Sequence, residues 1–242
     1  MIKRTVESLA RRAGYEIVPK WRVQNLAHAR KLKEIFEHFQ IAHVLDIGAN
    51  IGQFRDFLRA QVGYGGPIHS FEPLVSLVHQ MEQRGQQDRN WSIYPYALGA
   101  ADGVRDINVM AATTFSSFLA PSYEAVPELT EPNTISRTER VNVMTLDKAA
   151  TTLLRDIDFR RTFVKLDTQG FDLEVLDGGR STFAQIPVLQ TEVSLNPIYA
   201  GMPSMAESVA QFETAGFAIA DLYLVSKDAR YRAIELDCIM VR

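Results

Sequence analysis

The sequence is poor in the features that mark disulfide-bonded, secreted or membrane-spanning proteins. Cys238 is the only cysteine among 242 residues, so the chain can form neither an internal disulfide nor a zinc site built on cysteines. No apolar run approaches the roughly 18 residues that a transmembrane helix needs. The charged N-terminus also lacks the apolar core of a secretory signal. We therefore expect a reducing compartment, the cytoplasm.

Two glycine-rich motifs for phosphate-bearing ligands are missing as well. The dinucleotide fingerprint G-x-G-x-x-G, begun at Gly48, would need glycine at two positions where the chain has Asn50 and Gln53. No Gly-Lys-Ser or Gly-Lys-Thr follows the turn, so a P-loop is excluded. The five histidines show no metal-ligand spacing, and no spacing of carboxylates demands a metal ion.

Charge is distributed unevenly along the chain. The net charge is −3, but residues 1–33 hold nine Lys or Arg and two acids, or +7, which leaves −10 for the remainder. This basic segment either contacts an anionic membrane face, a nucleic acid or a charged partner, or is a solvated helical extension lying on its own acidic body. We favour the second interpretation, because interspersed basic residues usually form a solvated face.

The hydrophobic periodicity predicts a helical extension followed by an α/β domain. Residues 1–40 have helical character, with an apolar stripe over 26–39. From residue 43 strands and helices alternate, which indicates a Rossmann-like, doubly wound mixed sheet of about seven strands in a domain over 41–242. The closing segments 217–225 and 233–241 predict an antiparallel C-terminal hairpin. The expected strands before them are 43–47, 68–71, 91–98, 163–166 and 187–193, and the expected helices are 53–61, 74–84, 147–156, 171–178 and 204–215.

An insertion interrupts this alternation at about residues 102–146. Two alternating segments, 104–110 and 140–146, flank a polar stretch that contains three prolines. We expect a hairpin-like pair with a long loop between its strands. Ser116 and Ser117 in this loop either line an acceptor pocket or are ordinary loop residues, and we favour the second interpretation.

Carboxylates end the first two predicted strands. Asp46 precedes a turn with Gly48 and Gly52, whose missing side chains allow a ligand to approach the backbone closely. Glu72 ends the second strand, where a carboxylate can accept hydrogen bonds from both hydroxyls of a ribose. Because Asp46 would repel a pyrophosphate, the ligand that fits best is S-adenosylmethionine, which has a ribose, a sulfonium and no phosphate.

The chain resembles the FkbM-type S-adenosylmethionine-dependent methyltransferases, which are class I enzymes. The motifs that carry the resemblance are Val44–Gly52, Phe71–Pro73, Tyr96–Gly99, Val143–Asp147 and Lys165–Gly178. It implies O-methylation, often of sugars or polyketide-type natural products. It also implies glutamates where this chain has Gln169 and Asp172. We expect the cofactor to contact the following residues: Asp46, Gly48, Asn50, Gly52, Glu72, Ala97 and Asp167.

Two carboxylates are the candidates for catalysis. Asp167 and Glu192 end two further strands of the predicted sheet, and either could accept the proton of an acceptor hydroxyl as general base. Lys165 shares the strand face of Asp167, and its burial requires an ion pair, which we expect with Asp167 or Asp46. Asp147 is predicted to cap the N-terminus of the helix that follows it.

Together with these residues, the family resemblance implies a methyltransferase that acts on a sugar hydroxyl of a glycan, a glycolipid or a natural product. Two alternatives remain. The basic segment could serve a nucleic-acid methyltransferase, although a pI of about 6.0 disfavours it. The chain could also be a non-catalytic module that binds S-adenosylmethionine. Peripheral membrane contact through the basic segment stays open, and the oligomeric state is not predicted.

Overall fold

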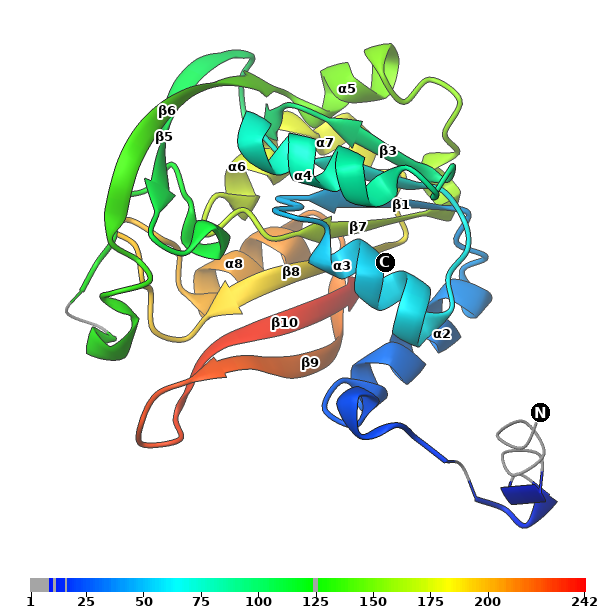
Figure 1. Cartoon of the computed structure of the whole chain (residues 1–242). Helices are drawn as coiled ribbons and strands as arrows, with labels where there is room; N and C mark the ends of the chain where they lie inside the picture. Colours follow the sequence, from blue (N-terminus) through cyan, green and yellow to red (C-terminus); the bar gives the residue numbers. More distant parts are fainter. Residues whose placement is uncertain (1–8, 11, 16, 124–125) are drawn as a thin grey trace.

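A seven-stranded mixed sheet forms the centre of the molecule (Figure 1). The structure is a computed structural model that describes residues 9–10, 12–15, 17–123 and 126–242. The first five strands across the sheet run parallel, and the last two are antiparallel to their neighbours. The predicted fold class is confirmed. The strands, in spatial order, are β3 (Trp91–Tyr94), β2 (Ile68–Phe71), β1 (His43–Ile47), β7 (Thr162–Leu166), β8 (Val188–Ser194), β10 (Ala233–Val241) and β9 (Ala218–Lys227).

The order of the strands reverses between β1 and β7. The chain builds β1, β2 and β3 toward one edge, and β7 then pairs with the free side of β1. Loops leave the carboxyl ends of these two strands in opposite directions, which opens a crevice between them. The functional site is therefore expected above β1 and β7.

Helices cover both faces of the sheet. One face packs against α2 (Leu26–His38), α3 (Gln53–Phe57) with the π-helical turn η2 (Leu58–Val62), and α4 (Val75–Gly85). The other face packs against α5 (Leu146–Thr152), α6 (Asp172–Gly178), α7 (Arg180–Phe183) and α8 (Met205–Thr214). The two apolar layers explain why the central strands are almost continuously hydrophobic. In the described part of the chain, no helix has the length and apolar character needed to cross a bilayer.

The predicted strand 91–98 is divided between two sheets. β3 ends at Tyr94, and β4 (Ala97–Leu98) belongs to a second, three-stranded sheet with β5 (Gly103–Met110) and β6 (Ile135–Met144). Pro95 cannot donate a ladder hydrogen bond, so the chain turns there and changes sheets. The hairpin-like pairing of the insertion is confirmed, because β5 and β6 pair antiparallel from Gly103 opposite Val143.

The described residues of the predicted helical extension form separate helical pieces. Among the described residues, 9–10 and 12 are helical, a short 3-10 helix η1 covers Lys20–Arg22, and α2 begins only at Leu26. Gly14 has a φ of 81°, and this left-handed conformation ends the helical turn that precedes it. Residues 1–8, 11 and 16 of the predicted extension lie outside the described residues. The apolar stripe of α2 is confirmed, because Ala29, Leu32, Ile35 and Phe36 are buried.

Asp147 does not cap the helix that contains it. Thr145 has the extended conformation of an N-cap residue, and its side chain accepts from the backbone N–H of Lys148 at 3.2 Å. Asp147 instead accepts from the backbone N–H groups of Ser181 at 3.2 Å and Thr182 at 2.8 Å. It therefore stabilises the first turn of α7 and ties α5 to it.

Candidate active site

A cavity of about 710 Å³ opens at the carboxyl ends of the parallel strands. Its floor comes from the turn after β1, the end of β2, the turn after β7 and the last part of β8. The predicted residues that line it are Gly48, Asn50, Glu72, Ala97, Asp167 and Glu192. Asp46 and Gly52 do not line the cavity and lie behind its wall.

The turn after β1 touches the turn after β7. Gly48 has a φ of 81°, and a Cβ built there would lie 2.0 Å from the main-chain oxygen of Asp167. The backbone N–H of Asp167 donates in turn to the carbonyl of Ile47 at 3.0 Å. Only glycine permits both this φ and this close approach, so Gly48 allows the turn after β1 to contact the turn after β7.

Glu72 is buried at the end of β2, where its two carboxylate oxygens organise the turns on either side. Oε2 accepts from the backbone N–H of Asn50, and Oε1 accepts from that of Leu74, both at 2.9 Å. Burial is the larger influence and raises the pKa of Glu72 to about 7, although both hydrogen bonds lower it. Each oxygen keeps a lone pair that can face a ligand in the cavity.

Asp46 acts beneath the cavity. It is fully buried, and its Oδ2 accepts from the Ser70 hydroxyl at 3.1 Å. The indole N–H of Trp91 donates to that same hydroxyl oxygen at 2.9 Å. Trp91 also lies against the backbone of Gly52, where a Cβ would come within 2.6 Å of its ring. One hydrogen-bonded chain therefore connects β3, β2 and β1 under the turn.

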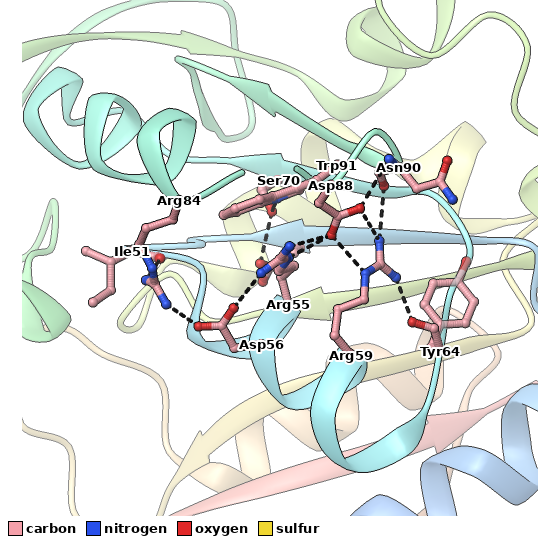
Figure 2. A network of polar contacts seen from close by, with 11 residues as sticks. Ile51, Arg55, Asp56, Arg59, Tyr64, Ser70, Arg84, Asp88, Asn90 and Trp91 are labelled. Atoms are coloured by element: carbon pink, nitrogen blue, oxygen red, sulfur yellow. Dashed lines mark hydrogen bonds and ion pairs between the residues drawn. The ribbon is translucent and has the colours of Figure 1, made fainter. Parts of the chain in front are cut away.

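Figure 2 shows the charged network that fixes α3 beside this turn. Asp88 accepts from Arg55 at 2.9 Å and from Arg59 at 3.0 Å. The guanidinium of Arg55 also stacks on the ring of Trp91, 4.7 Å from its centroid. Arg84 donates to the main-chain oxygen of Ile51. Because these contacts come from α4 and the segment before β3, the turn is anchored from outside the cavity.

Lys165 joins the two aspartates that the sequence offered as alternative partners. Its Nζ lies 2.8 Å from Asp167 Oδ2 and 3.8 Å from Asp46 Oδ1. Burial alone would lower the pKa of Lys165, but attraction to Asp167 and then Asp46 raises it overall, so the ammonium stays charged. Asp46 therefore contributes to the charge balance of the cavity through its ion pair with Lys165. The register explains the cluster, because Asp46 pairs with Lys165 across β1 and β7.

Asp167 and Glu192 are connected by one side chain. The amide nitrogen of Gln169 donates to Asp167 Oδ1 at 2.9 Å and to Glu192 Oε2 at 3.0 Å. Burial first, and then the charge of Asp167, raise the pKa of Glu192 well above its usual range. A carboxylate with a raised pKa is a better proton acceptor near neutral pH.

Parts of the cavity wall were not predicted. The insertion contributes Thr113, Thr114, Ser116, Ser117 and Phe118, so the two serines lie at the cavity, although the sequence favoured ordinary loop residues. The segment before α2 and α2 itself contribute Gln24, Asn25 and His28, and β9 and β10 contribute Tyr223, Leu224, Val225 and Asp237. His28 stacks on Tyr223 at 4.5 Å and lies 2.9 Å from the side-chain oxygen of Gln190. Only the polar character of Gln24 and Asn25 before an apolar helix could have signalled this wall.

The lining is strongly acidic. Four carboxylates, those of Glu72, Asp167, Glu192 and Asp237, face one ammonium, that of Lys165. This charge fits a cationic ligand such as a sulfonium, and it disfavours a polyphosphate. Within the described ranges, no three His, Cys, Asp or Glu side chains gather so that they could hold a metal ion.

Comparison with known proteins agrees with this geometry. The sequence model of the methyltransferase FkbM domain matches residues 46–231. The chain belongs to the FkbM methyltransferase family. The family prediction and the predicted cofactor, S-adenosylmethionine, are confirmed with it. No curated protein matches the chain by sequence.

Two solved methyltransferase structures are similar to this chain at low sequence identity. The methyltransferase FkbM from Methylobacillus flagellatus KT is 15% identical with a TM-score of 0.51, and the match covers 97% of this chain and 57% of that one. This chain thus spans little more than half of that protein. Magnesium protoporphyrin IX methyltransferase from Synechocystis PCC 6803 is 11% identical with a TM-score of 0.48, covering 91% of this chain and 81% of that one.

Proposed function

We propose that this methyltransferase transfers the methyl group of S-adenosylmethionine to a hydroxyl of a sugar in a glycan, a glycolipid or a natural product. The observation that carries the proposal is the pair Asp167 and Glu192, joined by Gln169 at the same sheet edge as the donor turn. The raised pKa of Glu192 supports its role as the base.

The donor half of the cavity fits the cofactor residue by residue. Gly48 and Asn50 offer backbone at close range, Glu72 offers lone pairs for the two ribose hydroxyls, and Ala97 offers a small apolar surface beside them. Asp167 would lie next to the positively charged part of the donor. Asp46 and Gly52, proposed from the sequence as direct contacts, would act through Lys165 and Trp91 instead.

In this reaction the residues of the chain have to align the two reactants and accept one proton. When bound, the cofactor supplies a methyl group already activated by its sulfonium. The cavity aligns the acceptor oxygen with that methyl group and excludes water. Glu192 would accept the proton of the acceptor hydroxyl, so that this oxygen can take the methyl group that the cofactor supplies. The proton gained by Glu192 would balance the positive charge that the donor loses.

The acceptor half of the cavity has the polar and aromatic character that a sugar requires. Amide side chains of Gln24, Asn25 and Gln190 line it and can both donate to and accept from hydroxyl groups. The stacked rings of His28 and Tyr223 offer a flat face for a sugar ring. This lining supports a glycan over a purely apolar acceptor.

The composition and exposure of the basic N-terminal segment favour contact with a membrane surface. Large apolar side chains on it are exposed, among them Trp21 at 63% and Tyr15 at 73%. They alternate with cationic residues such as Lys20, a combination typical of segments that bind anionic lipid surfaces. We propose that it brings the enzyme to a membrane-borne acceptor from the cytoplasmic side.

The experiment that tests the proposed function is a labelled-methyl transfer screen. Saccharides and lipid-linked glycans are compared with RNA and DNA of matched length at several salt concentrations. We expect label on a saccharide or a lipid-linked glycan. Transfer to nucleic acid alone, with a steep loss at high salt, would favour the alternative. Donor binding without transfer to any acceptor would favour a non-catalytic module.

A further inference from the structure

The amide of Gln169 is fully used by its neighbours. Its nitrogen lies 2.9 Å from Asp167 Oδ1 and 3.0 Å from Glu192 Oε2. Its Oε1 lies 2.9 Å from the Tyr199 hydroxyl, whose single hydrogen it shares with the Phe115 carbonyl at 2.7 Å. Ionised carboxylates only accept hydrogen bonds, so the NH₂ group is the end that faces them. That group carries two hydrogens, one for each carboxylate.

The backbone of Gln169 is held as firmly as its side chain. Its φ is 54°, a left-handed conformation, and its carbonyl accepts from the Ser117 hydroxyl at 2.7 Å. Asp172 fixes the same turn, because it accepts from the backbone N–H of Thr168 at 2.9 Å and from the Thr191 hydroxyl at 2.6 Å. The amide therefore has little freedom to leave the two carboxylates.

We propose that Gln169 is a positioning residue, which holds Asp167 and Glu192 side by side as ionised carboxylates and so keeps Glu192 ready to accept a proton. This inference rests on the proposed function, in which these carboxylates face the acceptor. A glutamate at this position, as the family resemblance implies elsewhere, would add a third negative charge and bring no hydrogen. A methionine, which is similar in length, would add no negative charge and would also donate no hydrogen bond.

The surroundings of Glu192 explain why it needs these hydrogens. Burial, together with the charges of carboxyl groups from the turn after β7, from α6 and from β10, opposes its ionisation. Lys165 compensates Asp167 by direct contact at 2.8 Å. The amide of Gln169 donates to Glu192 itself, so its loss acts on Glu192 directly. The groups that face Glu192 are Asp167, Asp172, Tyr199, Glu235 and Asp237.

The test is a titration of the Glu192 carboxyl by ¹³C NMR in the full chain without ligands. The signal is assigned by its absence from the spectrum of Glu192→Gln. In Gln169→Met we expect the pKa of Glu192 to rise by about one unit or more, which is a tenfold change in its protonation equilibrium. The matched control is Gln80→Met, since Gln80 is exposed on α4 and donates within its own helix, to the Ser76 carbonyl at 3.3 Å. It should leave the titration unchanged.

Two further variants keep the proposal falsifiable if Gln169→Met does not fold. Gln169→Glu should raise the pKa of Glu192 further and add a new titrating carboxyl signal. Tyr199→Phe leaves the amide but frees its oxygen, and we expect a smaller rise. A Glu192 titration that does not move in any folded variant at position 169 overturns the proposal, even if stability falls. Binding of S-adenosylhomocysteine, measured on the same samples, reports on the proposed function separately, because the titration requires no ligand.

Discussion

Replacing Glu72 by glutamine perturbs the donor half of the cavity with almost no change in shape. Both carboxylate oxygens of Glu72 accept a backbone hydrogen bond at 2.9 Å, one from Asn50 and one from Leu74. A glutamine has a single side-chain oxygen, so one of these buried N–H groups would face an NH₂ group. The variant loses a charge-assisted hydrogen bond and leaves one donor unpaired.

The size of the effect follows from that lost bond. A hydrogen bond to a charged group contributes about 1.5–3 kcal/mol, and the turn that it fixes belongs to the donor site. We expect the affinity for S-adenosylhomocysteine to fall by about 10- to 150-fold in Glu72→Gln. Isothermal titration calorimetry at pH 8 measures it, with Glu82→Gln as the control because Glu82 is an exposed acid on the neighbouring helix α4.

The same variant should change the pH dependence of stability. Burial raises the pKa of Glu72 from 4.5 to about 7 in the folded state. Between these values the folded state binds more protons than the unfolded state, so the contribution of Glu72 to the free energy of unfolding is largest below pH 4.5 and is lost as the pH rises to about 7. The full difference is about 3 kcal/mol. Urea unfolding at pH 5 and pH 8 should show this loss in the wild type and in Glu82→Gln, but not in Glu72→Gln. Equal pH slopes and unchanged affinity in all three proteins would refute the reasoning.

Three other predictions use matched variants. Gly48→Ala should lose several kcal/mol of stability in urea unfolding, or lose donor binding. The control is Gly63→Ala, because Gly63 has nearly the same φ and nothing lies within 4 Å of a Cβ built there. The control should show only the cost of a left-handed alanine, about 1–2 kcal/mol. Equal losses would contradict the close contact. Trp21→Ser should lower the fraction of the protein that sediments with anionic vesicles, whereas Val104→Ser, at an exposed site on β5, should leave it unchanged. Equal sedimentation of the two variants would contradict the proposed membrane contact. Lys165→Met should lower the free energy of unfolding by about 3–5 kcal/mol, because the buried carboxylate of Asp46 and the half-buried carboxylate of Asp167 lose their cation; a fully stable variant would contradict this charge balance.

The sequence predicted the part of the site that follows from parallel strands. Glu72 and Asp167 directly follow strands, and Glu192 lies two residues before the end of β8. Because carboxyl ends of parallel strands meet at one edge, their shared cavity could be expected without coordinates. Asp46 also ends a strand, but its side chain points toward Lys165 and Ser70 below the turn. The direction of a side chain at a strand end depends on how the next turn folds, and the sequence pattern did not specify it.

The remaining walls depend on contacts between distant segments. Phe118 from the insertion, His28 from α2 and Tyr223 from β9 meet in one cavity although nearly 200 residues separate the second from the third. Periodicity reports which residues face a core, but it does not report which segments lie opposite each other. The division of residues 91–98 between two sheets had a local signal in Pro95, and the break in the N-terminal helix had one in Gly14.

The most direct test of the account is single-turnover methyl transfer by Glu192→Gln with saturating donor, using an acceptor identified in the screen. The account predicts an affinity for S-adenosylhomocysteine near that of the wild type and a rate lower by about 10²-fold or more, since the variant keeps its shape and loses the base. A rate above about half that of the wild type would show that Glu192 does not accept the proton, and the proposed use of this cavity would be wrong.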